Sequence, residues 1–131
     1  MERLKRILIA GRTYPYKIDL NVLEAIQERY GSISQFERDL LGYRFKKDEK
    51  GAQVYDQEGE PIMYRVEPSI KAIRAVLPEA INEGLAIEAE ETGREFASVS
   101  EDHVMRNCSI SYELLSRMLH DEFKRCFETK K

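Results

Sequence analysis

Apolar side chains alternate with polar ones at the start of the chain, and this period of two predicts a β-hairpin. They recur at every second position on both sides of Gly11, at Ile7, Ile9, Tyr14, Tyr16, Ile18 and Leu20. Gly11 followed by Arg12 suits the two central positions of a type II′ turn, so we expect the strands to be joined there. Pro15 has no N–H to donate and therefore favours an edge strand.

Two short helices are predicted next, over 21–30 and 32–41. Asn21 and Ser32 are strong N-cap residues, and each is followed three positions later by Glu or Gln, as in a capping box. A glycine follows each segment, where a left-handed residue commonly ends a helix. The apolar positions repeat at helical spacing, at Leu23, Ile26, Tyr30, Phe36, Leu40 and Leu41.

Residues 43–67 differ from both flanking regions. Tyr43 and Phe45 alternate with charged residues, and the stretches 46–51 and 56–59 are polar and end in glycine. This pattern predicts two or three antiparallel strands, joined by turns, in a projecting insert.

The longest helical signal begins after Pro68. Apolar residues occur there at steps of three or four, at Ile70, Ile73, Leu77, Ile81, Leu85 and Ala89. Pro78 lies within this helix and predicts a kink or a split, because its ring clashes with the preceding turn. A last helical segment begins at the N-cap Ser100, and the weak helix formers at 107–111 allow a break within it.

These elements predict an α+β fold dominated by helix, with an N-terminal β-hairpin and a small antiparallel insert at 43–67. The chain has 131 residues, of which 42% are hydrophobic, and this is the size of one domain, 1–131. No apolar run approaches the ~18 residues of a membrane span. The two cysteines, Cys108 and Cys126, indicate free thiols and a cytoplasmic protein.

The charges are nearly balanced overall but unevenly distributed. Twenty-one Lys and Arg residues against 24 Asp and Glu residues give a net charge of −3, which disfavours a nucleic-acid binder held by a basic field. Residues 1–17 carry five bases and one acid, whereas 83–102 carry seven acids and one base. The acidic segment fits either a solvated face or a docking patch for a basic partner.

No catalytic or cofactor-binding motif is present, so we expect neither an enzyme nor a bound cofactor. The only metal-like set, His103, Cys108, His120 and Cys126, has gaps of five and six residues that turn paired ligands apart on a helix. We therefore expect no metal site. Asp121 and Glu122 beside His120 diverge by about 100° per residue and predict a solvated helix face rather than a catalytic set.

Five tyrosines fall on the predicted strands, and they permit two interpretations. They are Tyr14, Tyr16, Tyr43, Tyr55 and Tyr64. Tyrosines on a sheet form either a binding surface or ordinary cross-strand packing. Stacking on nucleic-acid bases is disfavoured, because basic residues that would track a phosphate chain are scarce around these tyrosines in the sequence.

Four apolar residues exceed what one buried helix face requires. Ile87 stands about 200° around the helix from Leu85, and Phe127 follows Phe123 close to the chain end. We predict that Leu85, Ile87, Phe123 and Phe127 present apolar surface to another chain or to a second protomer. The alternative is that a bend at Pro78 or Gly84 turns Ile87 into the core.

The order of parts resembles the small tail assembly chaperones of long-tailed bacteriophages and prophages. A hairpin ending in Ile18-Asp19-Leu20 leads into a short helix at 22–31 and a mainly helical remainder, and the resemblance is clearest over 7–42 and 69–93. The resemblance implies a non-enzymatic protein of the bacterial cytoplasm that binds the tape-measure protein and helps recruit tail-tube subunits. It implies tail proteins as partners, with homo-oligomers possible, and no nucleic acid.

Two alternatives of other classes remain. The first is a small regulatory or nucleic-acid-associated protein of a mobile element, which the basic N-terminus favours and the net charge disfavours. The second is an enzyme whose site the motifs do not reveal.

Overall fold

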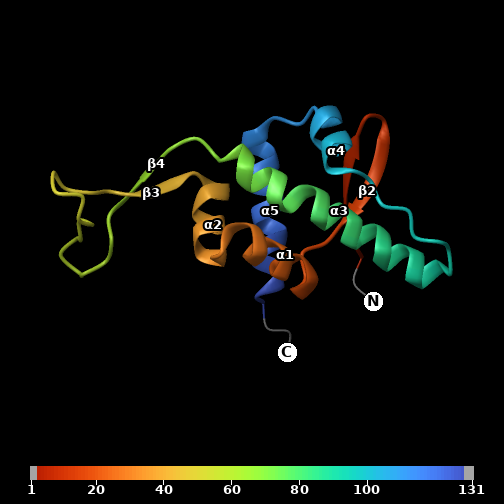
Figure 1. The fold of residues 1–131 in the computed structure, drawn as a ribbon, viewed down its shortest axis with the longest axis horizontal. Coiled ribbons are helices and arrows are strands. Elements are labelled where there is room, and N and C mark those ends of the chain that lie inside the picture. Colours follow the sequence, from red (N-terminus) through yellow and green to blue (C-terminus); the bar gives the residue numbers. More distant parts are fainter. Residues whose placement is uncertain (1–2, 129–131) are drawn as a thin grey trace.

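The fold is helix-dominated α+β, as predicted (Figure 1). The computed structural model describes residues 3–128, which contain five helices and two two-stranded antiparallel sheets. In chain order the elements are β1 (Lys5–Ile9), β2 (Arg12–Tyr16), α1 (Leu20–Tyr30), α2 (Ile33–Leu41), β3 (Tyr43–Phe45), β4 (Met63–Arg65), α3 (Ile70–Thr92), α4 (Glu101–Asn107) and α5 (Tyr112–Cys126).

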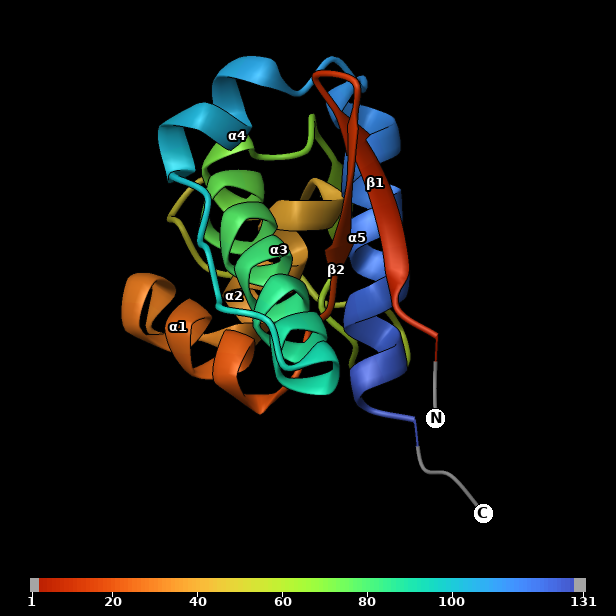
Figure 2. The same ribbon diagram turned by 90° about the vertical axis from the view of Figure 1, so that its right-hand side faces the viewer.

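Helix α3 lies at the centre of the molecule, with β2, α1, α2, α4 and α5 packed around it (Figure 2). The middle of the predicted apolar face is buried, at Ile73, Leu77 and Ile81. Its ends are not: Ile70 is 56% exposed and Leu85 is only half-buried. Spacing alone therefore overestimated the length of the buried face.

The hairpin is confirmed, but its turn is displaced by one residue from the predicted one. Ile9 pairs with Arg12, so the two central residues are Ala10 and Gly11 rather than Gly11 and Arg12. Both have positive φ, 51° and 77°, which is typical of a type I′ turn and not of the predicted type II′ turn. The type I′ twist matches that of the strands, and the register buries Ile7, Ile9, Tyr14 and Tyr16.

Helix α1 begins earlier than predicted. Its N-cap is Asp19, whose carboxylate accepts from the backbone N–H of Val22 at 3.2 Å, and not Asn21. Leu20 is therefore the first helical residue and is 80% exposed, rather than the last residue of a strand. Asn21 instead donates to Glu83 of α3 at 3.0 Å. The second predicted cap, Ser32, is confirmed and accepts from the N–H of Gln35.

Pro78 does not split α3, which runs without interruption from Ile70 to Thr92. The proline removes the N–H that would have bonded the carbonyl of Arg74, four residues earlier. The guanidinium of Arg29 on α1 donates to that carbonyl at 3.4 Å. A neighbouring helix thus replaces part of the lost bonding. The break allowed near 107–111 is confirmed, since α4 ends at Asn107 and Ser111 caps α5.

Residues 43–67, the arm, project from the body of the protein (Figure 1). The predicted meander is confirmed in part: β3 and β4 pair antiparallel, but the middle stretch makes only isolated bridges, Lys47 with Gln53 and Tyr55 with Pro61. No side chain of the arm is buried. Within residues 3–128, no helix combines the length and apolar character needed to cross a membrane.

Candidate functional site

The four apolar residues predicted to bind a partner do not form one surface. Leu85 and Ile87 are both half-buried. Although they stand about 200° apart around α3, neither is a core residue and neither is fully exposed. Phe127 is 57% exposed, as expected, whereas Phe123 is 3% exposed and belongs to the core. The prediction that Phe123 presents surface was wrong, because α5 turns this ring onto Phe36 of α2.

Phe127 lies over an apolar hollow between α2 and α5, which we call the α2–α5 hollow. The hollow measures about 420 Å³ and is lined by Ile33, Ser34, Glu37, Phe123, Lys124 and Phe127. The ring of Phe127 meets that of Phe123 edge-on, with centroids 5.0 Å apart. Leu85 lines a different hollow, formed with the charged residues Arg6, Arg12 and Glu88. The predicted residues therefore define two separate places.

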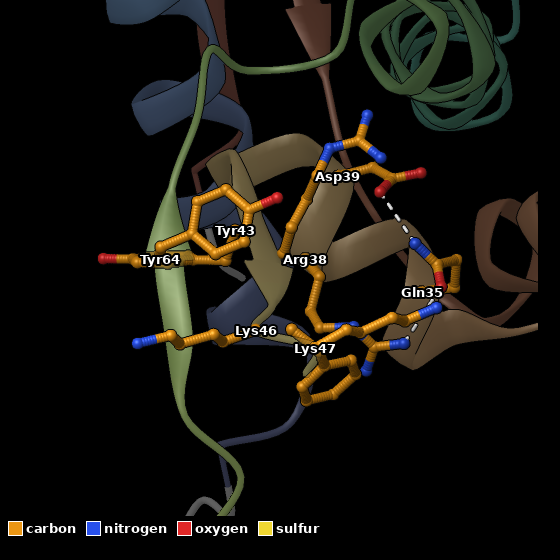
Figure 3. A pocket seen from close by; sticks show the side chains of 9 residues that line it. Gln35, Arg38, Asp39, Tyr43, Lys46, Lys47 and Tyr64 are labelled. Carbon is orange, nitrogen blue, oxygen red and sulfur yellow. Dashed lines mark hydrogen bonds between the residues drawn. The ribbon is translucent and has the colours of Figure 1, made fainter. Parts of the chain in front are cut away.

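A second hollow lies on the other side of α2, against β3, and we call it the basic hollow. It measures about 470 Å³ and is lined by Gln35, Arg38, Asp39, Tyr43, Arg44, Phe45, Lys46, Lys47 and Tyr64. Figure 3 shows side chains of α2 on one side of it and side chains of the arm on the other. Four of the nine lining residues are cations and one is an acid.

The wall formed by α2 is held by a chain of contacts. The guanidinium of Arg38 donates to Gln35 at 3.0 Å, and the amide of Gln35 donates to Asp39 at 2.7 Å (Figure 3). Arg38 also lies over the ring of Phe45, 4.5 Å from its centroid. This cation–π contact joins α2 to β3 and fixes the position of one positive charge.

Three cations of the basic hollow have no partner within residues 3–128. The side chains of Arg44, Lys46 and Lys47 make no ion pair, hydrogen bond or ring contact in this part of the chain. Elsewhere some arginines are paired, such as Arg6 with Glu88 at 2.7 Å, whereas Arg94, Arg106 and Arg117 also make no side-chain ion pair or hydrogen bond within residues 3–128. In a chain with more acids than bases, adjacent unpaired cations leave a local positive field.

The tyrosines divide between the two interpretations. Tyr14 and Tyr16 are buried and pack in the core, whereas Tyr43, Tyr55 and Tyr64 lie on the arm with half-exposed or exposed side chains. The statement that bases are scarce around the tyrosines was wrong for the arm. The short run from Tyr43 to Lys47 already signals the mixture of rings and bases, and tertiary structure adds Arg38.

Within the described residues, no three His, Cys, Asp or Glu side chains are placed to hold a metal ion. His120 contacts Glu37 at 2.8 Å, while Glu122 accepts from the backbone N–H of Ile18 at 2.6 Å and from Arg125. These adjacent residues diverge as predicted, but the prediction of a solvated helix face was wrong. Only Asp121 is exposed, whereas Glu122 is 2% exposed because the backbone of Ile18 and the guanidinium of Arg125 cover its carboxylate. Burial raises the pKa of the Cys126 thiol and so disfavours the thiolate that metal binding and nucleophilic attack require.

No protein-family model, curated protein or solved structure matches this chain. Its own geometry offers two hollows on opposite sides of α2. One is apolar with a polar rim of Glu37 and Lys124, and the other is basic with aromatic walls. Both are suited to non-covalent binding of another molecule.

Proposed function

We propose that this protein is a non-enzymatic tail assembly chaperone of a long-tailed phage or prophage. It binds the tape-measure protein and helps recruit tail-tube subunits in the cytoplasm of the bacterial host. The observation that carries the proposal is the exposed ring of Phe127 over the α2–α5 hollow. The order of parts supports the same assignment, through its resemblance to that family.

The α2–α5 hollow has the character of a groove for an amphipathic segment. Its floor is apolar, at Ile33 and Phe123, and Glu37 and Lys124 place opposite charges on its rim. An apolar side chain of a partner would remove Phe127 from water, at about 25 cal/mol per Å² of apolar surface buried. The rim charges would orient the segment more than they add affinity.

The test is co-expression with the tape-measure protein encoded beside this chain. Unmodified protein is expected to keep the tape-measure protein soluble. Phe127→Ser is expected to lose this effect while its free energy of unfolding falls by less than about 1.5 kcal/mol, the range of one aromatic pair at a half-exposed position. Phe123→Ser is the matched control, four residues earlier in the sequence. It is expected to lower the free energy of unfolding by about 3 kcal/mol or more. A soluble, well-folded Phe127→Ser complex would contradict the proposal, as would the absence of a neighbouring tape-measure gene.

A second candidate is the small regulatory or nucleic-acid-associated protein. The observation that favours it is the set of unpaired cations beside Tyr43 and Tyr64 in the basic hollow. This candidate predicts that the protein shifts the electrophoretic mobility of single-stranded DNA and that the shift weakens as salt rises. The acidic net charge of −3 argues against this second candidate.

A further inference from the structure

The basic hollow follows the outer edge of β3. Five consecutive residues, 43–47, line it, although successive side chains of a strand point to opposite faces. Because both faces of β3 contribute, the hollow runs along the strand's edge, and it also reaches Tyr64 of β4, the cross-strand partner of Arg44. Gln35, Arg38 and Asp39 of α2 form the opposite wall (Figure 3).

This edge of β3 has free backbone groups. The N–H of Val66 donates to the carbonyl of Gly42 at 2.7 Å, and the N–H of Lys46 donates to the carbonyl of Ile62 at 2.8 Å. In an antiparallel pair the bonded positions alternate, so Tyr43 and Phe45 direct their N–H and C=O groups away from β4. No backbone hydrogen bond from these groups is formed within residues 3–128. An extended peptide can therefore add to this edge.

The charges around the edge select the peptide's chemistry. Arg44, Lys46 and Lys47 lie along it without acidic partners, and Arg38 stands on the opposite wall. Asp39 is the one acid among the described residues that line the hollow, and Gln35 donates to it. An incoming strand with carboxylates at successive or alternate positions would pair with these cations on both faces.

We propose that β3 is the docking edge for an acidic, extended segment of the partner protein, which adds as a third strand between β3 and α2. The proposal rests on the proposed function in taking the ligand to be a polypeptide, and it concerns a different surface from the α2–α5 hollow. Backbone bonds at Tyr43 and Phe45 supply the docking geometry, and the unpaired cations supply specificity for acidic sequence.

A peptide fits this edge better than a nucleic-acid strand does. Arg38 lies over the ring of Phe45, and Arg65 lies 5.5 Å from the ring centroid of Tyr43, so one face of each ring is already covered. The far end of the arm carries acids at Asp56, Glu58 and Glu60. A phosphate chain leaving the hollow along the arm would meet these acids instead of a continuing basic track.

The test is a titration of the full-length protein with the blocked peptide Glu-Thr-Glu-Val-Glu-Thr-Glu, with the same peptide carrying Gln for Glu, and with single-stranded oligothymidylate. The acidic peptide is expected to bind with an affinity that falls as salt rises, and the Gln peptide is not expected to bind. The triple substitution Arg44→Gln, Lys46→Gln, Lys47→Gln is expected to weaken binding by about tenfold. Amide hydrogens of Tyr43 and Phe45 are expected to exchange more slowly in the complex.

The matched control removes the same charge elsewhere, by Arg94→Gln, Arg106→Gln and Arg117→Gln at exposed positions. Equal weakening by both triple variants, no binding of the acidic peptide, or unchanged amide exchange at Tyr43 and Phe45 would overturn the proposal. Oligothymidylate that binds and displaces the peptide would also overturn it, and would favour the nucleic-acid candidate. The proposed chaperone function is tested separately, by the solubility of the tape-measure protein with Phe127→Ser. A failed peptide titration would therefore overturn the docking edge without deciding the chaperone function.

Discussion

Gly84 lies within α3 at the point where this helix passes the backbone of β2 and the residues that follow it. A Cβ at this position would stand 2.7 Å from the carbonyl carbon of Pro15 and 2.9 Å from the backbone nitrogen of Tyr16. The N–H of Lys17 also donates to the carbonyl of Ala80 in α3, at 3.0 Å. The missing side chain therefore sets how closely the hairpin docks on the central helix.

We predict that Gly84→Ala destabilises the protein. Alanine favours helix over glycine by up to about 1 kcal/mol, but the new methyl group meets rigid backbone rather than a movable side chain. The net loss in the free energy of unfolding is expected to be roughly 1–2 kcal/mol, measured by urea denaturation. Glu90→Ala, at an exposed position of the same helix, is the control and should change little. An equally stable Gly84→Ala protein would show that the hairpin shifts freely on α3.

At the scale of elements, the arm and the helical body are stabilised differently. The arm is held by hydrogen bonds of its backbone and by turns. In one of these turns the carboxylate of Asp48 accepts from the backbone N–H groups of Lys50 and Ala52. It buries no side chain, whereas the body has a continuous core of residues from the hairpin and all five helices. The arm thus contributes surface rather than core stability.

Shortening the arm is therefore expected to leave the body intact. Replacing residues 47–61 with Asn-Gly would join the two sides of the arm by a tight turn and remove no buried side chain. The free energy of unfolding should change by less than about 1 kcal/mol, and the helical circular dichroism signal per molecule should be retained. Loss of cooperative unfolding in this variant would mean that the arm belongs to the folding unit.

Across the whole molecule, one charge cluster joins three helices that are distant in sequence. Glu101 at the start of α4 accepts from Arg29 of α1 at 3.1 Å and from Arg74 of α3 at 2.8 Å, and Arg74 also reaches Asp102. The hydrogen bonds from Arg29 and Arg74 lower the pKa of Glu101 below its ordinary value of 4.5. This cluster ties the start of α4 to α1 and α3.

The lowered pKa of Glu101 determines how the stabilisation by this charge cluster depends on pH. An acid whose folded-state pKa is depressed stabilises the fold above its unfolded pKa and loses that effect as the pH falls through the folded value. Glu101→Gln is therefore expected to cost about 0.5 kcal/mol near pH 7, a small value because the side chain is 36% exposed and screened by solvent. The difference from the unmodified protein should shrink as the pH falls below the unfolded pKa of about 4.5 and vanish only once the pH is below the lowered pKa of the folded state, as measured by thermal unfolding. Glu91→Gln, at an exposed position of α3, is the control, and an equal cost in both variants would contradict this account.

Elements whose signals are local could be predicted from the amino-acid sequence. Ser32 and Ser100 cap their helices through their own hydroxyl groups, and the period-two pattern around Gly11 forms the predicted hairpin. Helix termini and strand alternation depend on residues within a few positions, so a linear pattern contains them. For the same reason α+β class and the position of the arm followed from the chain alone.

Features that depend on residues distant in sequence could not be predicted from local patterns. Phe123 and Phe127 are the same residue type four positions apart, so spacing predicts the same environment for both. In the structure α2 covers the ring of Phe123 and leaves that of Phe127 exposed. Pro78 stays within an unbroken helix beside Arg29, and the basic hollow exists because α2 brings Arg38 against the arm. Burial and uncompensated charge are sums over everything packed nearby, and a residue's neighbours along the chain do not fix those sums.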